Sequence, residues 1–264
     1  MKITALVENI SDCELKAKHG LSLYIETDRH KILFDLGPNQ TLFQNAAKRN
    51  IDLTQVDTVI ISHGHLDHGG GLGRFLAINH TAKVYIQRSA FLRHTTKVLG
   101  LQFNCGIKPE FQNHPQVQLL DGDYQIDDQL RLFTVKDKSR CYSTANDSLY
   151  EEKKPDTFSH EQHLLILGEQ NVLIMGCGHS GIVNIMAQAK QYNPVLCIGG
   201  YHLMNPNGGI SVSESLLDQI VTALKAYPNT KFYTCHCTGQ AAYHYLADRM
   251  PNMHYLSCGQ SVTV

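Results

Sequence analysis

Apolar residues along the chain follow two patterns, which alternate from one segment to the next. Short runs rich in β-branched and aromatic residues predict strands, and longer segments with apolar residues at helical spacing predict helices. The predicted strands are residues 2–7, 22–26, 31–34, 58–62, 83–86, 163–167, 171–175, 195–198, 231–234 and 253–256. The predicted helices are residues 41–49, 72–78, 182–191, 212–226 and 240–249.

The connections between these elements indicate the sheet type and the domain organisation. Turn-like residues at 27–30 and 168–170 join two pairs of predicted strands, so both pairs are expected to form antiparallel hairpins. Helix 212–226 has one apolar face, and Ser211 or Ser213 with Glu214 can cap its start. A chain of 264 residues with this alternation predicts a single α/β domain spanning residues 1–264. Region 89–155 has weak periodicity and is expected to be an irregular insertion or a set of loops.

Composition and charge exclude several classes of protein. A hydrophobic fraction of 42% with 18% charged residues is typical of a globular chain. The net charge is −1 and no segment concentrates Lys and Arg, so neither nucleic acid nor an anionic membrane is an expected partner. No apolar stretch reaches the roughly 18–20 residues that span a bilayer, and the first residues turn polar too soon for a signal peptide. We therefore expect a cytoplasmic protein that acts on a small molecule.

The eight cysteines do not indicate a disulfide framework in a chain of this length. Cys197 lies in an apolar run and is expected to be a small buried hydrophobic residue. Cys235 and Cys237 flank His236, but the absence of a second cysteine pair argues against a structural zinc site.

The segment from residue 58 to 73 carries the strongest chemical signal. An apolar β-branched run leads into His63, His65, Asp67 and His68, and glycines follow. A strand end would aim His63 and His65 to one side, since residues i and i+2 share a face in extended backbone. Asp67 and His68 would then lie on the turn leading into a helix, and glycines would let that turn pass close to a ligand without a Cβ clash. Imidazoles and a carboxylate without thiolates suit zinc, iron or manganese in a reactive site.

The spacing His-x-His-x-Asp-His, after an apolar strand and before glycines, resembles the metallo-β-lactamase superfamily. Residues 32–37, which end in Asp35-Leu36-Gly37, resemble the early strand of that family. Segments 176–184, 199–203 and 236–239 resemble the branch labelled 7,8-dihydropterin-6-methyl-4-(β-D-ribofuranosyl)aminobenzene-5′-phosphate synthase-like. The resemblance implies a four-layer αββα sandwich, in which two mixed sheets are flanked by helices.

The resemblance also implies two metal positions. One ion would be held by His63, His65 and His179, and the other by Asp67, His68 and His236. Zinc is the expected metal at both positions, with manganese or iron as alternatives. Hydrolytic members of the family carry a bridging aspartate after the strand that ends here near residue 175, where this chain has Cys177. A thiolate bridge, a shared water only, and a merely packing Cys177 all stay open.

Three further residues have two interpretations each. Asp35 is expected to orient a ligating histidine rather than to bind metal. His202 follows another predicted strand and could donate a proton or hold a phosphate, or be an ordinary loop residue. His160, in the segment His160-Glu161-Gln162-His163, invites a metal interpretation by composition, although this segment is expected to open a strand.

These observations predict a metal-dependent hydrolase. Two divalent ions about 3.5–4 Å apart would activate a water for attack on an ester, phosphodiester or similar bond. Asp67 would serve as ligand and proton acceptor, and His202 is the second candidate catalytic residue. No Gly-x-Ser-x-Gly motif indicates a protein nucleophile. The branch resemblance keeps a pterin-linked transferase as the alternative, followed by a di-iron oxidoreductase and a non-catalytic metal-binding sensor.

Overall fold

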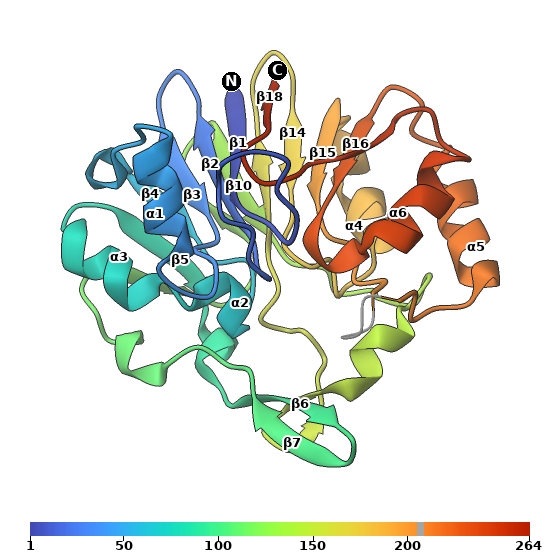
Figure 1. Cartoon of the computed structure of the whole chain (residues 1–264), viewed down its shortest axis with the longest axis horizontal. Helices are drawn as coiled ribbons and strands as arrows, with labels where there is room; N and C mark the ends of the chain where they lie inside the picture. The colour runs from blue at the N-terminus through green and yellow to red at the C-terminus, as the bar shows by residue number, and fades with distance from the viewer. Residues whose placement is uncertain (205–208) are drawn as a thin grey trace. The chain divides into compact units, whose positions relative to one another are not determined.

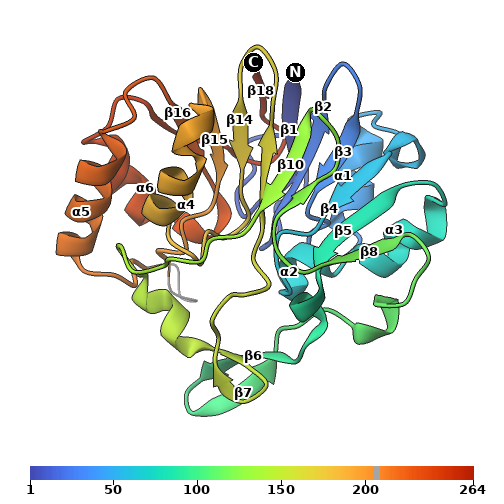
Figure 2. The same cartoon turned by 180° about the vertical axis from the view of Figure 1, so that it is seen from behind.

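The computed structural model describes residues 1–204 and 209–264, which form two compact units. The first unit comprises Met1–Gly122, Leu149–Gln162 and Ser257–Val264, and the second comprises Asp123–Ser148 and His163–Leu256. Figures 1 and 2 show the chain from opposite sides. Each unit has its own mixed β-sheet with helices packed on it, which confirms the α/β class predicted from the sequence.

The sheet of the first unit has the strand order β18-β1-β2-β3-β4-β5-β8. Its strands in chain order are β1 (Lys2–Val7), β2 (Ser22–Glu26), β3 (Lys31–Phe34), β4 (Thr58–Ile60), β5 (Lys83–Gln87), β8 (Val117–Leu120) and β18 (Ser261–Thr263). Strands β2 and β3 pair antiparallel, which confirms the hairpin predicted at 27–30. Strands β3, β4, β5 and β8 run parallel, so their carboxyl ends lie at one edge of the sheet.

Three helices belong to the first unit, and two of them pack on its sheet. They are α1 (Thr41–Lys48), α2 (Leu66–Gly69) and α3 (Leu72–Ile78). Leu42 of α1 and Phe75 of α3 are buried in one cluster with Leu33, Val59 and Val84 of the sheet. The blue and teal helices of Figure 1 are α1 and α3. Because this packing buries one face of each helix, the helical spacing of apolar residues was visible in the sequence.

A second, smaller sheet of the first unit falls inside the region predicted to be irregular. Its order is β12-β11-β6-β7, formed by β6 (His94–Val98), β7 (Leu101–Asn104), β11 (Leu149–Glu151) and β12 (Lys154–Pro155). Strand β7 is exposed along its whole length. A strand without a buried face has no alternating apolar pattern, so sequence periodicity did not predict it.

The sheet of the second unit has the order β17-β16-β15-β14-β13-β10-β9. Its strands in chain order are β9 (Tyr124–Gln125), β10 (Leu130–Phe133), β13 (His163–Ile166), β14 (Val172–Ile174), β15 (Leu196–Gly199), β16 (Lys231–Thr234) and β17 (Met253–Tyr255). Strands β13 and β14 pair antiparallel, which confirms the hairpin predicted at 168–170. Strands β14 to β17 run parallel.

The helices of the second unit pack on this sheet through one apolar cluster. They are α4 (Ile182–Ala189), α5 (Glu214–Leu224) and α6 (Gln240–Ala247). Ser213 caps α5, since its side chain accepts a hydrogen bond from the backbone N–H of Leu216. Leu217, Ile220 and Leu224 lie on the buried face of α5, as their spacing predicts. None of the helices in the described chain combines the length and hydropathy that a membrane crossing requires.

Candidate metal centre

The parallel pairing of β3 and β4 brings Asp35 next to Ser62. Asp35 directly follows β3, and its backbone N–H donates to the carbonyl of Ile60 at the end of β4, over 2.8 Å. Asp35 has a φ of 62°, a left-handed conformation that a non-glycine residue rarely adopts. This conformation turns the side chain toward the residues that follow β4.

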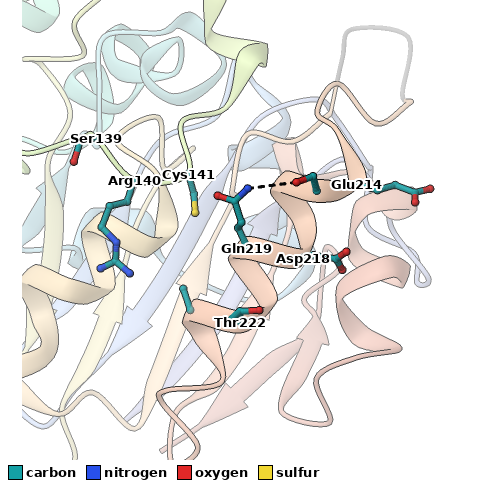
Figure 3. A pocket seen from close by; sticks show the side chains of 9 residues that line it. Ser139, Arg140, Cys141, Glu214, Asp218, Gln219 and Thr222 are labelled. Carbon is teal, nitrogen blue, oxygen red and sulfur yellow. Dashed lines mark hydrogen bonds between the residues drawn. The ribbon is translucent and has the colours of Figure 1, made fainter.

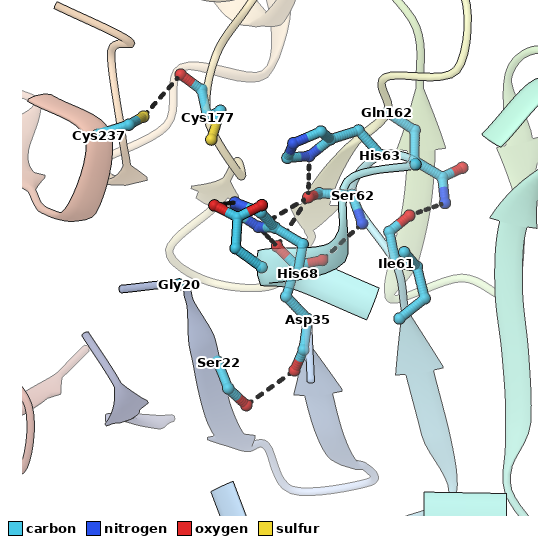
Figure 4. Close-up of polar contacts among 12 residues, drawn as sticks. Gly20, Ser22, Asp35, Ile61, Ser62, His63, His68, Gln162, Cys177 and Cys237 are labelled. Atoms are coloured by element: carbon cyan, nitrogen blue, oxygen red, sulfur yellow. Dashed lines mark hydrogen bonds and ion pairs between the residues drawn. The ribbon is translucent and has the colours of Figure 1, made fainter. Parts of the chain in front are cut away.

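The Asp35 carboxylate accepts three hydrogen bonds in a buried position (Figure 4). Oδ1 accepts from the backbone N–H of Ser62 over 2.7 Å, and Oδ2 accepts from the Ser62 hydroxyl over 2.7 Å. Oδ2 also lies 2.6 Å from Nδ1 of His68. A carboxylate can only accept, so Nδ1 of His68 carries a proton, and in the neutral ring the lone pair is on Nε2. Asp35 thus orients His68, as predicted, and the role of His68 as a metal ligand stays a prediction.

The same carboxylate acts on His63 through Ser62. Nδ1 of His63 lies 2.8 Å from the Ser62 Oγ. Because the Ser62 hydroxyl donates its single proton to Asp35, its oxygen accepts from His63 Nδ1–H. The lone pair of His63 is therefore also on Nε2, the atom that a metal ion would use.

The four residues of the His-x-His-x-Asp-His motif lie together in the first unit. The ring centroid of His63 lies 4.6 Å from that of His65 and 4.2 Å from that of His68. Asp67 Oδ2 lies 3.7 Å from His68 Nε2. The three imidazoles are buried, whereas the Asp67 side chain is 25% exposed. Burial, followed by the nearby His160, holds the pKa of His65 well below its usual value, so the ring is neutral as a metal ligand must be.

Two local predictions about this segment were wrong. Strand β4 ends at Ile60, before His63 and His65, so the pleat of a regular strand does not align them, although His65 itself has extended backbone angles (φ −87°, ψ 147°). Asp67 and His68 lie within the short helix α2 rather than on a turn before a helix. A ligand close to the glycines stays a prediction. In the structure Gly70 approaches the backbone of the protein itself, since a Cβ there would lie 2.2 Å from the carbonyl oxygen of Pro38.

The donor set of the first unit fits a divalent transition metal. Imidazoles and a carboxylate are ligands of zinc, iron and manganese, and none of the four motif residues is a cysteine of the kind that structural zinc sites use. The proton positions on His63 and His68, set by Asp35 and Ser62, direct both Nε2 lone pairs away from their hydrogen-bond partners.

The second unit gathers its own ligand-type residues at the carboxyl ends of parallel strands. Cys177 and His179 follow β14, His202 follows β15, and His236 follows β16. The ligand atoms of Cys177, His179 and His202 lie within 4.8 Å of one another, and so do those of Cys177, His236 and Cys237. The thiol of Cys237 donates to the carbonyl of Cys177 over 3.4 Å.

His179 is oriented by Asn146, a residue that no sequence signal indicated. The Asn146 amide N–H donates to the backbone carbonyl of His179 over 3.0 Å, so its Oδ1 is the atom facing His179 Nδ1, 2.8 Å away. His179 Nδ1 therefore carries the proton and Nε2 the lone pair. His179 does not cap α4, because Gly181 is the N-cap residue and no side chain caps it.

His202 and Cys237 differ from ordinary loop residues. The ring centroid of His202 lies 4.2 Å from that of His179, and His202 has a φ of 49°. Burial alone would raise the pKa of the Cys237 thiol, but its interactions with Cys177, His202 and His236 bring that pKa well below its usual value. The thiolate is the form of cysteine that binds metal, so a lowered pKa favours metal binding by Cys237.

Comparison with known proteins assigns the chain to a family. The family model described as the metallo-β-lactamase superfamily matches residues 16–181. The chain belongs to the metallo-β-lactamase superfamily. Its structure is similar to the crystal structure of Tm1679, a metal-dependent hydrolase of the β-lactamase superfamily, with a TM-score of 0.82 and 25% identity over 100% of this chain and 99% of that one. The metallo-β-lactamase fold predicted from the sequence is thereby confirmed.

Two curated relatives of this superfamily member come from Methanocaldococcus jannaschii. An uncharacterized protein is 28% identical over 246 residues, covering 90% of each chain. The 7,8-dihydropterin-6-methyl-4-(β-D-ribofuranosyl)-aminobenzene-5′-phosphate synthase is 26% identical over 268 residues, covering 90% of this chain and 88% of the relative. The second similarity agrees with the branch that the sequence motifs indicated.

The second unit also contains a pocket away from the histidines (Figure 3). Arg140 and Cys141 line one side, and Asp218, Gln219 and Thr222 of α5 line the other. No histidine is among its described lining residues. The histidines that follow β14, β15 and β16 therefore do not line this pocket.

Proposed function

We propose that this metallo-β-lactamase superfamily member is a metal-dependent hydrolase of an ester, phosphodiester or similar bond in a small molecule. The observation that carries the proposal is the buried carboxylate of Asp35. It fixes His68 directly and His63 through Ser62, so that both rings present Nε2 lone pairs. Neutral, pre-oriented imidazoles beside a carboxylate are what a catalytic metal site requires.

The proposed metal ligands are the residues that the sequence indicated. His63, His65, Asp67 and His68 are the ligands of the first unit, and His179 and His236 are the remaining ligands that the family resemblance implies. The expected cofactor is two divalent ions, zinc first and manganese or iron as alternatives. Such ions would lower the pKa of a water toward about 7 and stabilise negative charge on a substrate oxygen.

Asp67 and His202 are the proposed catalytic side chains. The Asp67 carboxylate is partly exposed and lies 3.3 Å from His19 Nε2, which is itself exposed, so protons can reach it from solvent. Asp67 would accept a proton from the attacking water. His202 is half-buried beside His179, where it would donate a proton to a leaving group or hold a phosphate.

A transferase is the second candidate function. It is supported by the 26% identity, over 90% of this chain, to the dihydropterin–aminobenzene ribofuranosyl phosphate synthase. A transferase would use the same metal ligands but would require a second substrate in place of water. Turnover that depends on an added arylamine and a pterin, with no turnover of simple esters, would favour this candidate.

The experiment that tests the proposal combines elemental analysis of the purified protein with a panel of carboxyl esters, phosphodiesters, thioesters and lactones. We expect one to two transition-metal ions per chain and metal-dependent turnover of at least one class. The His68→Ala variant is the matched inactive control. Protein that binds no metal even after reconstitution would refute the proposal.

A further inference from the structure

A second group of side chains of the types that bind metal lies next to the segment His63-Gly64-His65 in the first unit. His94 begins β6, Asp156 follows β12, and His160 precedes β13. All three are buried, and their ligand atoms and one of His65 lie within 4.8 Å of one another. By residue type alone, this group would suit a metal ion.

The backbone N–H of Gly64 determines which ring nitrogen of His160 carries the proton. The N–H of Gly64 donates to Nδ1 of His160 over 2.9 Å. A backbone N–H can only donate, so Nδ1 holds the lone pair and Nε2 carries the proton, which it donates to Asp156 Oδ2 over 3.1 Å. A metal ion on Nε2 would require the ring to lose this proton or to give up Gly64. The hydrogen bonds therefore favour a structural network over a metal site.

The other partners complete this network. Nε2 of His94 lies 3.2 Å from the carbonyl of Ser89, and its Nδ1 lies 3.2 Å from Asp156 Oδ2; both oxygens only accept, so both contacts are hydrogen bonds only in the doubly protonated ring. Asp156 Oδ1 accepts from the N–H of Phe158 over 2.6 Å. Burial alone would raise the pKa of Asp156, but the hydrogen bonds from His160 and His94 hold that pKa well below its usual range. The charged carboxylate thus accepts hydrogen bonds from Phe158 and His160.

The network contacts the segment that carries two of the proposed metal ligands. Gly64 stands between His63 and His65, and a Cβ added to it would lie 2.5 Å from the Ala90 carbonyl oxygen and 2.8 Å from His94 Nε2. The His65 ring packs edge-on against His160, with centroids 5.5 Å apart. The backbone that sets the direction of His63 and His65 is therefore held by the hydrogen bond from Gly64 to His160.

We propose that Asp156 and His160 are positioning residues of the metal centre and are not metal ligands. Asp156 fixes the His160 ring, and Nδ1 of His160 fixes Gly64 and so the directions of His63 and His65. This inference rests on the proposed function, because it takes His63 and His65 as ligands. Outer hydrogen-bond partners of this kind typically change metal affinity by about 10–100-fold.

Two substitutions of His160 separate its two hydrogen bonds. In His160→Asn the amide oxygen stands near the position of Nδ1 and can still accept from Gly64. In His160→Gln the amide stands near the position of Nε2, so the contact with Asp156 is kept and the acceptor for Gly64 is lost. Asn79→Ala, which removes a buried hydrogen-bonding side chain elsewhere in the first unit, controls for general loss of stability.

The measurements are zinc affinity by chelator competition, cobalt stoichiometry, and the visible spectrum of the cobalt-loaded protein. We expect His160→Gln to weaken zinc binding about 10–100-fold and to shift the cobalt absorption bands, at unchanged stoichiometry. Asn79→Ala should stay within about threefold of wild type. His160→Asn, which keeps the acceptor for Gly64 but loses the contact with Asp156, should weaken zinc binding less than His160→Gln does. Thermal melting identifies a variant that fails to fold, and Asp156→Asn then provides an independent test with the same expected direction as His160→Gln.

Different results overturn different statements. Wild-type protein that binds no cobalt or zinc refutes the proposed function and this inference with it. Metal-binding wild type with His160→Gln and Asp156→Asn indistinguishable from it refutes only the inference. Loss of one whole cobalt equivalent in His160→Gln, with the remaining spectrum unchanged, would show that the group is itself a metal site.

Discussion

Nδ1 of His68 lies 2.6 Å from Oδ2 of Asp35, and both side chains are fully buried. The same oxygen accepts from the Ser62 hydroxyl, which in turn faces His63. One buried carboxylate therefore sets the proton positions on two proposed metal ligands. Removing its negative charge would leave both imidazoles free to adopt the tautomer that cannot bind metal through Nε2.

Asp35→Asn should weaken metal binding. An amide keeps only one acceptor oxygen, and its NH₂ group would face the Ser62 N–H or the His68 Nδ1–H, so at least one of these hydrogen bonds is lost. We expect the zinc dissociation constant to rise about 10–100-fold, measured by competition with a chromophoric chelator.

The control for this variant is Ser22→Ala. The Ser22 hydroxyl donates to the backbone carbonyl of Asp35 over 2.8 Å and does not touch its carboxylate. Zinc affinity should stay at the wild-type value. Equal losses in both variants would assign the effect to the local fold after β3 rather than to the carboxylate.

His179→Ala and His236→Ala should each lower the metal content by about one ion while the protein stays folded, because its core supplies most of the stability. Both residues lie at the carboxyl ends of parallel strands in the second unit. Elemental analysis after dialysis against metal-free buffer measures the effect. A variant that retains the wild-type stoichiometry would remove that histidine from the ligand set.

Cys177→Asp should strengthen binding of the second ion, because a carboxylate can span two hard or borderline cations where a thiol stands now. Cys177 is buried, and its Sγ lies within 4.8 Å of ligand atoms of His236 and Cys237. Metal titrations of wild type, Cys177→Asp and Cys177→Ser decide the point. Cys197→Ala, which changes a buried core cysteine in β15, is the control. Identical affinities for both ions in all these proteins would show that Cys177 only packs.

The ionised Asp156 carboxylate should make the free energy of unfolding of the metal-free protein fall at acid pH. Its pKa is lowered in the folded state relative to about 3.9 in the unfolded chain, so its contribution to stability is present above that value and is lost as the pH falls through the folded value. Urea unfolding in the presence of chelator measures the free energy of unfolding from about pH 6 to pH 3. Asp156→Asn should lose less stability over this range, by at most about 1.4 kcal/mol per pH unit. Parallel curves for the two proteins would contradict the assignment.

The sequence predicted most of the regular elements that bury one face, but it missed β10, in which Leu130 and Leu132 are buried. Strands β1, β2, β3 and β16 and helix α3 have the predicted bounds, and most other predicted elements differ by one to two residues at an end. The exposed strands of the small sheet were not predicted, because they lack the alternation that burial imposes. Helix α2 was missed because four residues are too few to show a helical period.

The sequence by itself determined the candidate ligands, since His63, His65, Asp67 and His68 stand within six consecutive positions. Only the tertiary structure decided their chemical state. Asp35 and His68 are 33 residues apart, as are Asn146 and His179, and Gly64 and His160 are 96 residues apart. Local patterns record which face of an element is buried. Hydrogen bonds between strand ends depend on which strands become neighbours, and that is settled only when the sheet forms.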